Sequence, residues 1–129
     1  DESIRFDHKV AASEMAHKDR NASLAHFMKS FGRLRHDVDN VLGTYFHQCS
    51  IAMSCQQLAS AGLYLVSNGV DKHSGVRVIN EKRARRINSL MMMCGHYDGS
   101  GEFAYRVGLP GKSGVGGGIV ALLPNKFCV

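Results

Sequence analysis

The stretch from Gly108 to Leu123, GLPGKSGVGGGIVALL, limits what this chain can fold into more than any other segment. After Lys112 and Ser113 the backbone runs through several glycines, which disfavour the start of a helix because they lose the most conformational freedom on ordering. The short apolar run Ile119–Leu123 begins with β-branched residues and is typical of a strand. The segment therefore predicts a flexible turn that leads into a strand.

A phosphate-binding loop is the first alternative for this segment, and the sequence does not meet its requirements. The pattern G-x-x-x-x-G-K-[ST] needs a glycine at position 106, where this chain has Arg106, and it needs a helix directly after the hydroxyl residue. A lysine, a hydroxyl residue and a glycine on a strand instead match the Lys-[Ser/Thr]-Gly motif of serine acyl-transferring enzymes. Lys112 and Ser113 are therefore candidate catalytic residues of an amidase.

Residues 1–96 are expected to be mainly helical. A first helix is predicted to be capped by Asp19 and to end at Gly32. Apolar residues recur along it at helical spacing, which predicts that one side of the helix faces the core. The residues on that side are Leu24, Phe27, Met28, Phe31 and Leu34.

A second helix is predicted to open with Ser54 and Gln57, which have the spacing of a capping box, and to stop at Asn68-Gly69. Its inward residues are expected to be Leu58, Ala61 and Leu65.

A third helix is predicted to be capped by Asn80 and to end at Gly95. Its basic run is expected to face solvent and comprises Lys82, Arg83, Arg85 and Arg86. The residues expected to be buried are Ile87, Leu90, Met91 and Cys94, and the triplet Met91–Met93 is interpreted as core filler.

Residues 97–129 differ from the helical part. Asp98–Gly101 predict a turn, Glu102–Arg106 a short helix, and Pro110 a break before the Lys-Ser-Gly strand, with a further strand at 126–129. Helices followed by strands predict an α+β fold rather than alternating βαβ units. With 129 residues, the chain suits a single domain, and its two ends suggest a partial domain from a longer protein.

Composition narrows the function classes. The net charge is +5, and the chain has one dense basic run, from Lys82 to Arg86. On a helix such a run is more often a solvated face than a nucleic-acid site, and the chain has no tryptophan for stacking bases. The four cysteines and seven histidines show no metal-ligand spacing, so we expect no metal and no cofactor. No apolar run has the length of a membrane span, so we expect no membrane partner and a cytoplasmic protein with reduced thiols.

Several longer stretches carry a family resemblance: VAASEMAHKDRNASLAHFMKSFG, YFHQCSIAMSC and MMMCGHYDGSGEFAYRVGLPGKSGVGGGIVALLP. In this order they closely resemble the serine-dependent glutaminases, a family with a β-lactamase-like fold that hydrolyses L-glutamine to L-glutamate and ammonia. The resemblance covers nearly the whole chain and implies the middle-to-late part of the catalytic domain. It also implies L-glutamine as the small-molecule substrate and a homo-oligomer.

The resemblance implies a set of site residues. The family's substrate-binding positions fall on Glu14, Asn21, Tyr45, Tyr97 and Val115. The family's nucleophile belongs to a Ser-x-x-Lys pattern, which this chain does not contain.

The chemistry of these residue types suits a free amino acid. A carboxylate at Glu14 would pair with the substrate ammonium, and Asn21 and Tyr97 would donate hydrogen bonds to its carboxylate. Tyr45, with Lys112 as a neighbouring cation, would relay protons, and the Val115 N–H would stabilise an oxyanion. Taken singly, each residue has a structural explanation: a surface carboxylate, a first-turn helix residue, two packed aromatic rings and an ordinary strand residue.

Two rival functions remain open. Another serine acyl hydrolase of the same fold would act on β-lactams or peptides, although Glu14 and Asn21 suit a free amino acid better. A non-enzymatic binding module would use the basic helix around Arg83 and would bind nucleic acid in a salt-sensitive way.

Overall fold

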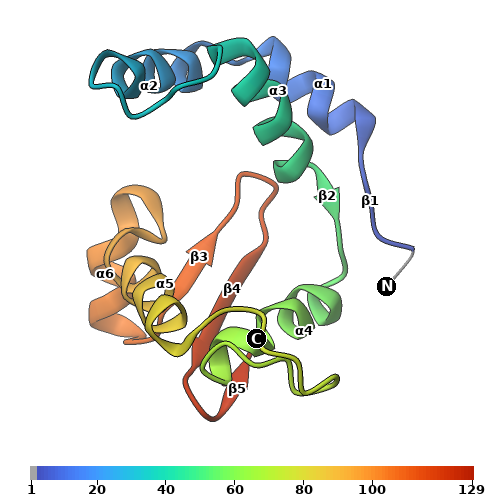
Figure 1. Cartoon of the computed structure of the whole chain (residues 1–129), viewed down its shortest axis with the longest axis vertical. Coiled ribbons are helices and arrows are strands. Elements are labelled where there is room, and N and C mark those ends of the chain that lie inside the picture. The colour runs from blue at the N-terminus through green and yellow to red at the C-terminus, as the bar shows by residue number, and fades with distance from the viewer. Residues whose placement is uncertain (1–2) are drawn as a thin grey trace. The chain divides into compact units, whose positions relative to one another are not determined.

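The computed structural model describes residues 3–129 and divides the chain into two compact units, Asp1–Ala52 and Met53–Val129 (Figure 1). Each unit has its own hydrophobic cluster. Among the described residues, no helix combines the length and the apolar character that a membrane crossing requires.

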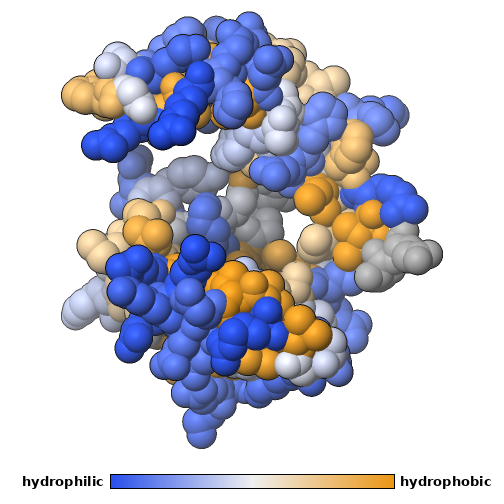
Figure 2. Space-filling view, in the orientation of Figure 1, coloured by the Kyte–Doolittle hydropathy of each residue, from blue (hydrophilic) through white to orange (hydrophobic). Residues whose placement is uncertain are grey.

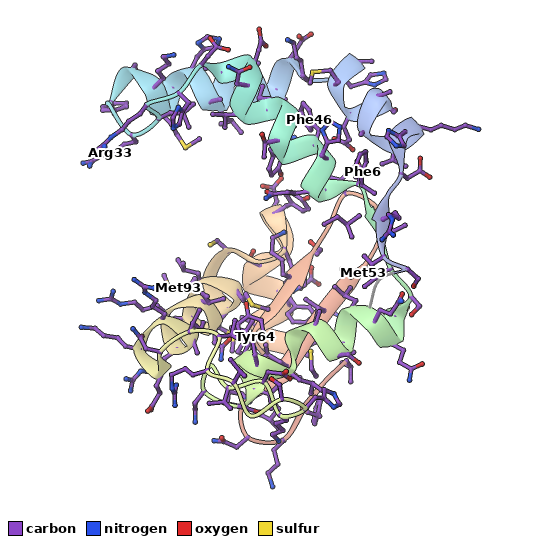
Figure 3. All side chains as sticks on the ribbon, turned by 45° about the vertical axis from the view of Figure 1, so that its right-hand side comes forward. Phe6, Arg33, Phe46, Met53, Tyr64 and Met93 are labelled. Carbon is purple, nitrogen blue, oxygen red and sulfur yellow. The ribbon has the colours of Figure 1, made fainter. Side chains whose placement is uncertain are left out.

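The first unit holds three helices and a short antiparallel pair of strands. The helices are α1 (His8–Ala16), α2 (Asp19–Ser30) and α3 (Val38–Cys49), and β1 (Arg5–Phe6) pairs with β2 (Ile51–Ala52). Both α1 and α2 pack against α3, around a core of Ala25, Val38, Leu42 and Phe46. Phe46, labelled in Figure 3, is the central side chain of this cluster, with 1% of its surface exposed.

Helices α1 and α3 were not predicted, although each has a clear start signal. The Asp7 carboxylate accepts from the backbone N–H groups of Lys9 and Val10, and the Asp37 carboxylate accepts from those of Asp39 and Asn40. An aspartate in this position satisfies amide groups that the first helical turn leaves unpaired. Asp7 and Asp37 are therefore the sequence signals that could have located both helices.

Two predictions about α2 are wrong. The residue before the helix is Lys18, and Asp19 is the first helical residue, whose side chain makes no capping hydrogen bond. The predicted core-facing side is exposed at Leu24, Phe27, Met28 and Phe31, between 47% and 66%, and only Leu34 of that set packs against the core. The small residues Ala22 and Ala25 face α3 instead, because the close packing of two helices favours small side chains at the contact.

The exposed side of α2 forms an apolar surface. Figure 2 shows apolar surface at the α2 end of the molecule, among hydrophilic residues. The rings of Phe27 and Phe31 pack edge-on with centroids 5.1 Å apart. Helix α2 does end where predicted, since Gly32 takes a positive φ of 66°.

The second unit combines helices with a three-stranded antiparallel sheet. Its helices are α4 (Cys55–Val66), α5 (Glu81–Cys94), the 3₁₀ turn η1 (Tyr97–Gly99) and α6 (Ser100–Arg106). The sheet has the order β3 (Gly111–Ser113), β4 (Ile119–Leu123), β5 (Phe127–Cys128). Helix α4 packs on β4 and β5, and α5 packs on β3. The core comprises Leu65, Val66, Ala84, Met91 and Leu122.

The predicted boundaries of α4 and α5 are confirmed. Ser54 and Gln57 form the capping box of α4, and Asn68 and Gly69 both have positive φ after its end. Asn80 caps α5 by accepting from the Arg83 N–H, and α5 ends at Gly95. The break at Pro110 and the strand Ile119–Leu123 also lie where expected. The short helix ends at Arg106 as predicted but begins at Ser100, so Ser100 and Gly101 of the predicted turn are helical.

The predicted burial in α4 and α5 is correct only in part. Leu58 and Leu65 are at least partly buried, whereas Ala61 is exposed. In α5, Met91 is buried and Ile87 partly so, but Leu90 and Cys94 are exposed. Met93, labelled in Figure 3, lies on the outer side of α5 with 76% of its surface exposed, so it is not core filler. The basic run faces solvent, as predicted.

The C-terminal strand packs closely against α4. A Cβ on Gly62 would lie 2.5 Å from the Cys128 Sγ, so the glycine allows β5 to approach the helix. Burial raises the pKa of the Cys128 thiol, which keeps it protonated. All four cysteines are free thiols.

Candidate functional site

The predicted site residues are divided between the two units. Glu14, Asn21 and Tyr45 belong to the first unit, on α1, α2 and α3. Tyr97, Lys112, Ser113 and Val115 belong to the second unit, in η1, β3 and the turn after β3. Each unit thus contributes a separate group of candidate residues.

In the first unit, the polar ends of Glu14 and Asn21 are not engaged by the fold. Glu14 and Asn21 are both partly buried. Among residues 3–129, neither the Glu14 carboxylate nor the Asn21 amide makes a side-chain hydrogen bond or an ion pair. A partly buried carboxylate and amide with no intramolecular partner are groups that a ligand can satisfy.

Tyr45 lies in the middle of α3, where its ring packs beside that of Phe46 with centroids 5.6 Å apart. It is 45% exposed and lines a surface hollow of about 430 Å³. The other lining residues are His36, Asn40, Val41, Thr44 and Gln48, and neither Glu14 nor Asn21 is among them. The structure therefore gives Tyr45 an accessible position on α3 but does not join it to Glu14 and Asn21 in one hollow.

In the second unit, three of the predicted residues lie together. The Lys112 Nζ is 5.0 Å from the centroid of the Tyr97 ring, and it donates to the backbone carbonyl of Ser113. A cation over an exposed aromatic face contributes about 0.5–1 kcal/mol. The ammonium and the phenol therefore lie beside each other on one exposed surface, which suits a carboxylate ligand.

The Ser113 side chain is turned into the fold. Its Oγ donates to the Gly95 carbonyl at 3.4 Å, and its backbone N–H donates to the same oxygen at 3.0 Å. The Lys112 amine reaches the carbonyl of Ser113 and not its hydroxyl. Ser113 therefore anchors β3 to the turn that follows α5.

Val115 lies in the turn between β3 and β4, not within a strand. It is 70% exposed, and the turn is closed by hydrogen bonds from the Gly114 N–H to Gly118 and from the Gly117 N–H to Gly114. Among the described residues, the Val115 N–H makes no hydrogen bond. An accessible N–H in a hydrogen-bonded turn has the properties of an oxyanion donor.

Tyr97 has an unusual backbone conformation. Its φ of 50° is in the left-handed region, which a bulky residue adopts only when its surroundings enforce it. The surrounding hydrogen bonds do so: Ser100 Oγ accepts from the His96 N–H at 2.9 Å and donates to the Tyr97 carbonyl at 3.0 Å. Buried Ser100 was missed from the sequence because its role depends on these two backbone groups.

The comparisons with known proteins identify the family of this chain. The family model described as Glutaminase matches residues 1–129. A glutaminase of Psychrobacter cryohalolentis is 79% identical over 126 residues, covering 98% of this chain and 41% of that protein. A glutaminase of Pseudoalteromonas atlantica is 71% identical, covering 100% of this chain and 42% of that protein.

Solved structures give the same result. The Bacillus subtilis glutaminase YbgJ, solved as a covalent complex with 5-oxo-L-norleucine, matches with a TM-score of 0.87 at 36% identity. The match covers 95% of this chain and 42% of that chain. The α+β, β-lactamase-like fold and the family resemblance predicted from the sequence are both confirmed.

The fold and the lysine-bearing strand define an α+β, β-lactamase-like domain. This chain belongs to the glutaminase family. It spans about two fifths of the length of the curated relatives it matches.

Proposed function

We propose that this protein, within a complete catalytic domain, hydrolyses the γ-carboxamide of L-glutamine to give L-glutamate and ammonia. The observation that carries the proposal is the identity of 79% to a glutaminase along 98% of the chain. The two units are, on this proposal, parts of a single partial catalytic domain spanning residues 1–129. L-Glutamine is the substrate that the family name implies.

The charged head of glutamine has suitable partners in both units. The Glu14 carboxylate binds the substrate ammonium, and the Asn21 amide and the Tyr97 phenol donate to the substrate carboxylate. The unengaged carboxylate and amide of the first unit support this assignment, and so does the Lys112 ammonium beside the Tyr97 ring. Lys112 adds a positive charge that attracts the same carboxylate.

The chemistry at the amide requires a nucleophile from outside this chain. In the proposed reaction, a serine hydroxyl attacks the γ-carbonyl carbon, the C–N bond breaks, and the nitrogen leaves as ammonia after receiving a proton. Water then hydrolyses the γ-glutamyl ester to glutamate and regenerates the hydroxyl. Tyr45 relays the proton, and the Val115 N–H stabilises the negative oxygen of each tetrahedral intermediate.

Lys112 and Ser113 have a supporting part in this proposal. Lys112 supplies the positive charge of the strand that borders the substrate. The anchored Ser113 side chain keeps β3 against the turn at Gly95. Homo-oligomeric assembly and a cytoplasmic location belong to the same proposal, and the exposed apolar side of α2 supports the assembly.

The test is an assay of the complete enzyme with L-glutamine, in which released ammonia and glutamate are both measured. Equal amounts of the two products are expected. Nitrocefin serves as the control for the rival acyl hydrolase. Hydrolysis of nitrocefin without hydrolysis of L-glutamine would overturn the proposal.

A further inference from the structure

The backbone of the turn after α5 contacts β3 more closely than any side chain would allow. A Cβ on Gly95 would lie 1.8 Å from the Gly111 carbonyl oxygen, so the backbone of Gly95 lies directly against this carbonyl with no side chain between them. Next to this contact, the Gly95 carbonyl accepts from both the N–H and the Oγ of Ser113. The strand and the turn are therefore joined at both ends of β3.

The side chain of His96 fills the space beside this junction. Its ring stacks on Phe103 of α6, with centroids 3.9 Å apart and planes inclined by 29°. A Cβ on Gly111 would lie 2.7 Å from the His96 Nε2 and 2.9 Å from the Phe103 Cε1. The stacked rings therefore rest directly on the bare backbone of Gly111.

The polarity of the imidazole is not what holds it in place. Its Nε2 is buried and has no hydrogen-bond partner among the described residues. Leaving a buried polar atom unpaired costs free energy, so the ring is held by its shape and its stacking. His96 is followed directly by Tyr97, whose left-handed backbone must be enforced by its surroundings.

We propose that the stacked pair of His96 and Phe103, resting on Gly111, is a positioning device that sets where the Tyr97 ring lies relative to Lys112. Gly111 precedes Lys112 in β3, and His96 precedes Tyr97 in the turn. The contact of His96 with Gly111 therefore sets the positions of both Tyr97 and Lys112. His96 and Phe103 act only through Tyr97 and Lys112 and are positioning residues. This inference rests on the proposed function, since it assigns Tyr97 and Lys112 to the substrate carboxylate.

The experiment is a double-mutant cycle in the complete enzyme, with Gly111→Ala, His96→Ala and the double variant. In Gly111→Ala, the added methyl group pushes the stacked rings away, and we expect kcat/KM to fall by about 10- to 100-fold. The loss should lie mainly in KM, because the stacked rings position Tyr97 and Lys112, and these two residues bind the substrate carboxylate. In the His96→Ala background, Phe103 can move aside, so adding Gly111→Ala should cost less than about threefold more.

Two controls accompany the cycle. Gly101→Ala is the matched control, because no atom lies within 4 Å of a Cβ at that glycine, and it should keep the kinetics of the parent enzyme. Thermal unfolding shows that each variant is folded. A 3-fluorotyrosine label at Tyr97 reports the position of the ring by ¹⁹F NMR without relying on turnover.

The two proposals fail in different ways. A parent enzyme that does not hydrolyse L-glutamine contradicts the proposed function, and the fluorine signal then decides the inference alone. A fluorine signal that shifts in Gly111→Ala and His96→Ala but not in Gly101→Ala supports the positioning role. An unchanged signal in Gly111→Ala, or full additivity of the two substitutions in kcat/KM, would overturn it.

Discussion

The two units hold their candidate residues in different ways. In the first unit, Glu14, Asn21 and Tyr45 project from three separate helices. In the second unit, Tyr97 and Lys112 are held by direct contacts between backbone segments, at Gly95, Gly111 and Ser113. Helix-borne residues can be repositioned by small shifts in packing, whereas backbone contacts allow very little movement. The difference predicts that an added methyl group near the site is tolerated less well in the second unit than in the first.

The largest expected effect is a loss of turnover when Tyr45 of the first unit is changed. Tyr45→Phe removes the proposed proton relay and should lower kcat by about 10²- to 10⁴-fold in the complete enzyme. The ring and its packing beside Phe46 are preserved, so the variant should still fold, which thermal unfolding checks. Tyr105→Phe is the matched control, because Tyr105 is 92% exposed and lies outside the site. Near-normal turnover by Tyr45→Phe would exclude the relay role.

The next prediction concerns the core of the first unit. Phe46→Ala empties the centre of its hydrophobic cluster and should lower the free energy of unfolding by about 3–5 kcal/mol. Phe27→Ala, on the exposed side of α2, should change it by less than about 1 kcal/mol as long as no partner covers that side. Urea unfolding of both variants measures the contrast. Equal losses would mean that the α2 side is packed in the complete protein, and would sharpen the case for assembly through it.

A smaller loss of stability is expected when the contact between Gly95 and Gly111 in the second unit is disturbed. Gly95→Ala places a methyl group against the Gly111 carbonyl and should destabilise the protein by about 1–3 kcal/mol. Gly99→Ala, where a Cβ meets no atom within 4 Å, is the control and should stay within about 0.5 kcal/mol. Thermal unfolding monitored by circular dichroism compares the two. If Gly95→Ala were as stable as Gly99→Ala, the rigidity assigned to the second unit would be wrong.

The smallest effect is the pH dependence of an exposed ion pair in the first unit. The Lys18 Nζ donates to the Asp39 carboxylate at 2.6 Å, and this hydrogen bond lowers the pKa of Asp39 and raises the pKa of Lys18. The stabilisation by Asp39 is therefore complete above the ordinary pKa of aspartate, about 3.9, and is lost as the pH falls through its lower folded value. The stabilisation by Lys18 is complete below the ordinary pKa of lysine and is lost as the pH rises through its higher folded value.

Asp39→Asn tests this pair. It should remove a small part of the stability at neutral pH and flatten the fall in melting temperature on acidification. Asp98→Asn is the control, because the Asp98 side chain has no hydrogen bond or ion pair within residues 3–129. Identical acid profiles for the parent and Asp39→Asn would show that the pair contributes nothing.

Local signals explain which parts of the fold could be predicted. The boundaries of α4 and α5 follow from Ser54, Asn80 and Gly95, because capping and chain reversal involve residues adjacent in sequence. The exposed side of α2 could not be predicted, because apolar spacing shows that a helix has an apolar side but not which neighbour covers it. The smaller alanines pack on α3 instead.

The residues of the candidate site also fall into two groups, those that the sequence identified and those that it did not. Lys112 and Ser113 stand out in the sequence because they belong to one short motif, and Glu14, Asn21, Tyr45, Tyr97 and Val115 were identified by resemblance. His96, Phe103 and Gly111 carried no such signal. Their relation depends on a ring stack and a glycine that lie on three different elements.

The sequence alone determined the family, the succession of a mainly helical part and a part with strands, and the chemical types available to a glutamine site. These depend on residue identity and on neighbours within a few positions along the chain. Only the tertiary structure decided that the Lys112 ammonium lies over the Tyr97 ring and that Gly95 and Gly111 meet without side chains between them. Such contacts join residues far apart in sequence, and their geometry is set by how closely two backbone segments can pack.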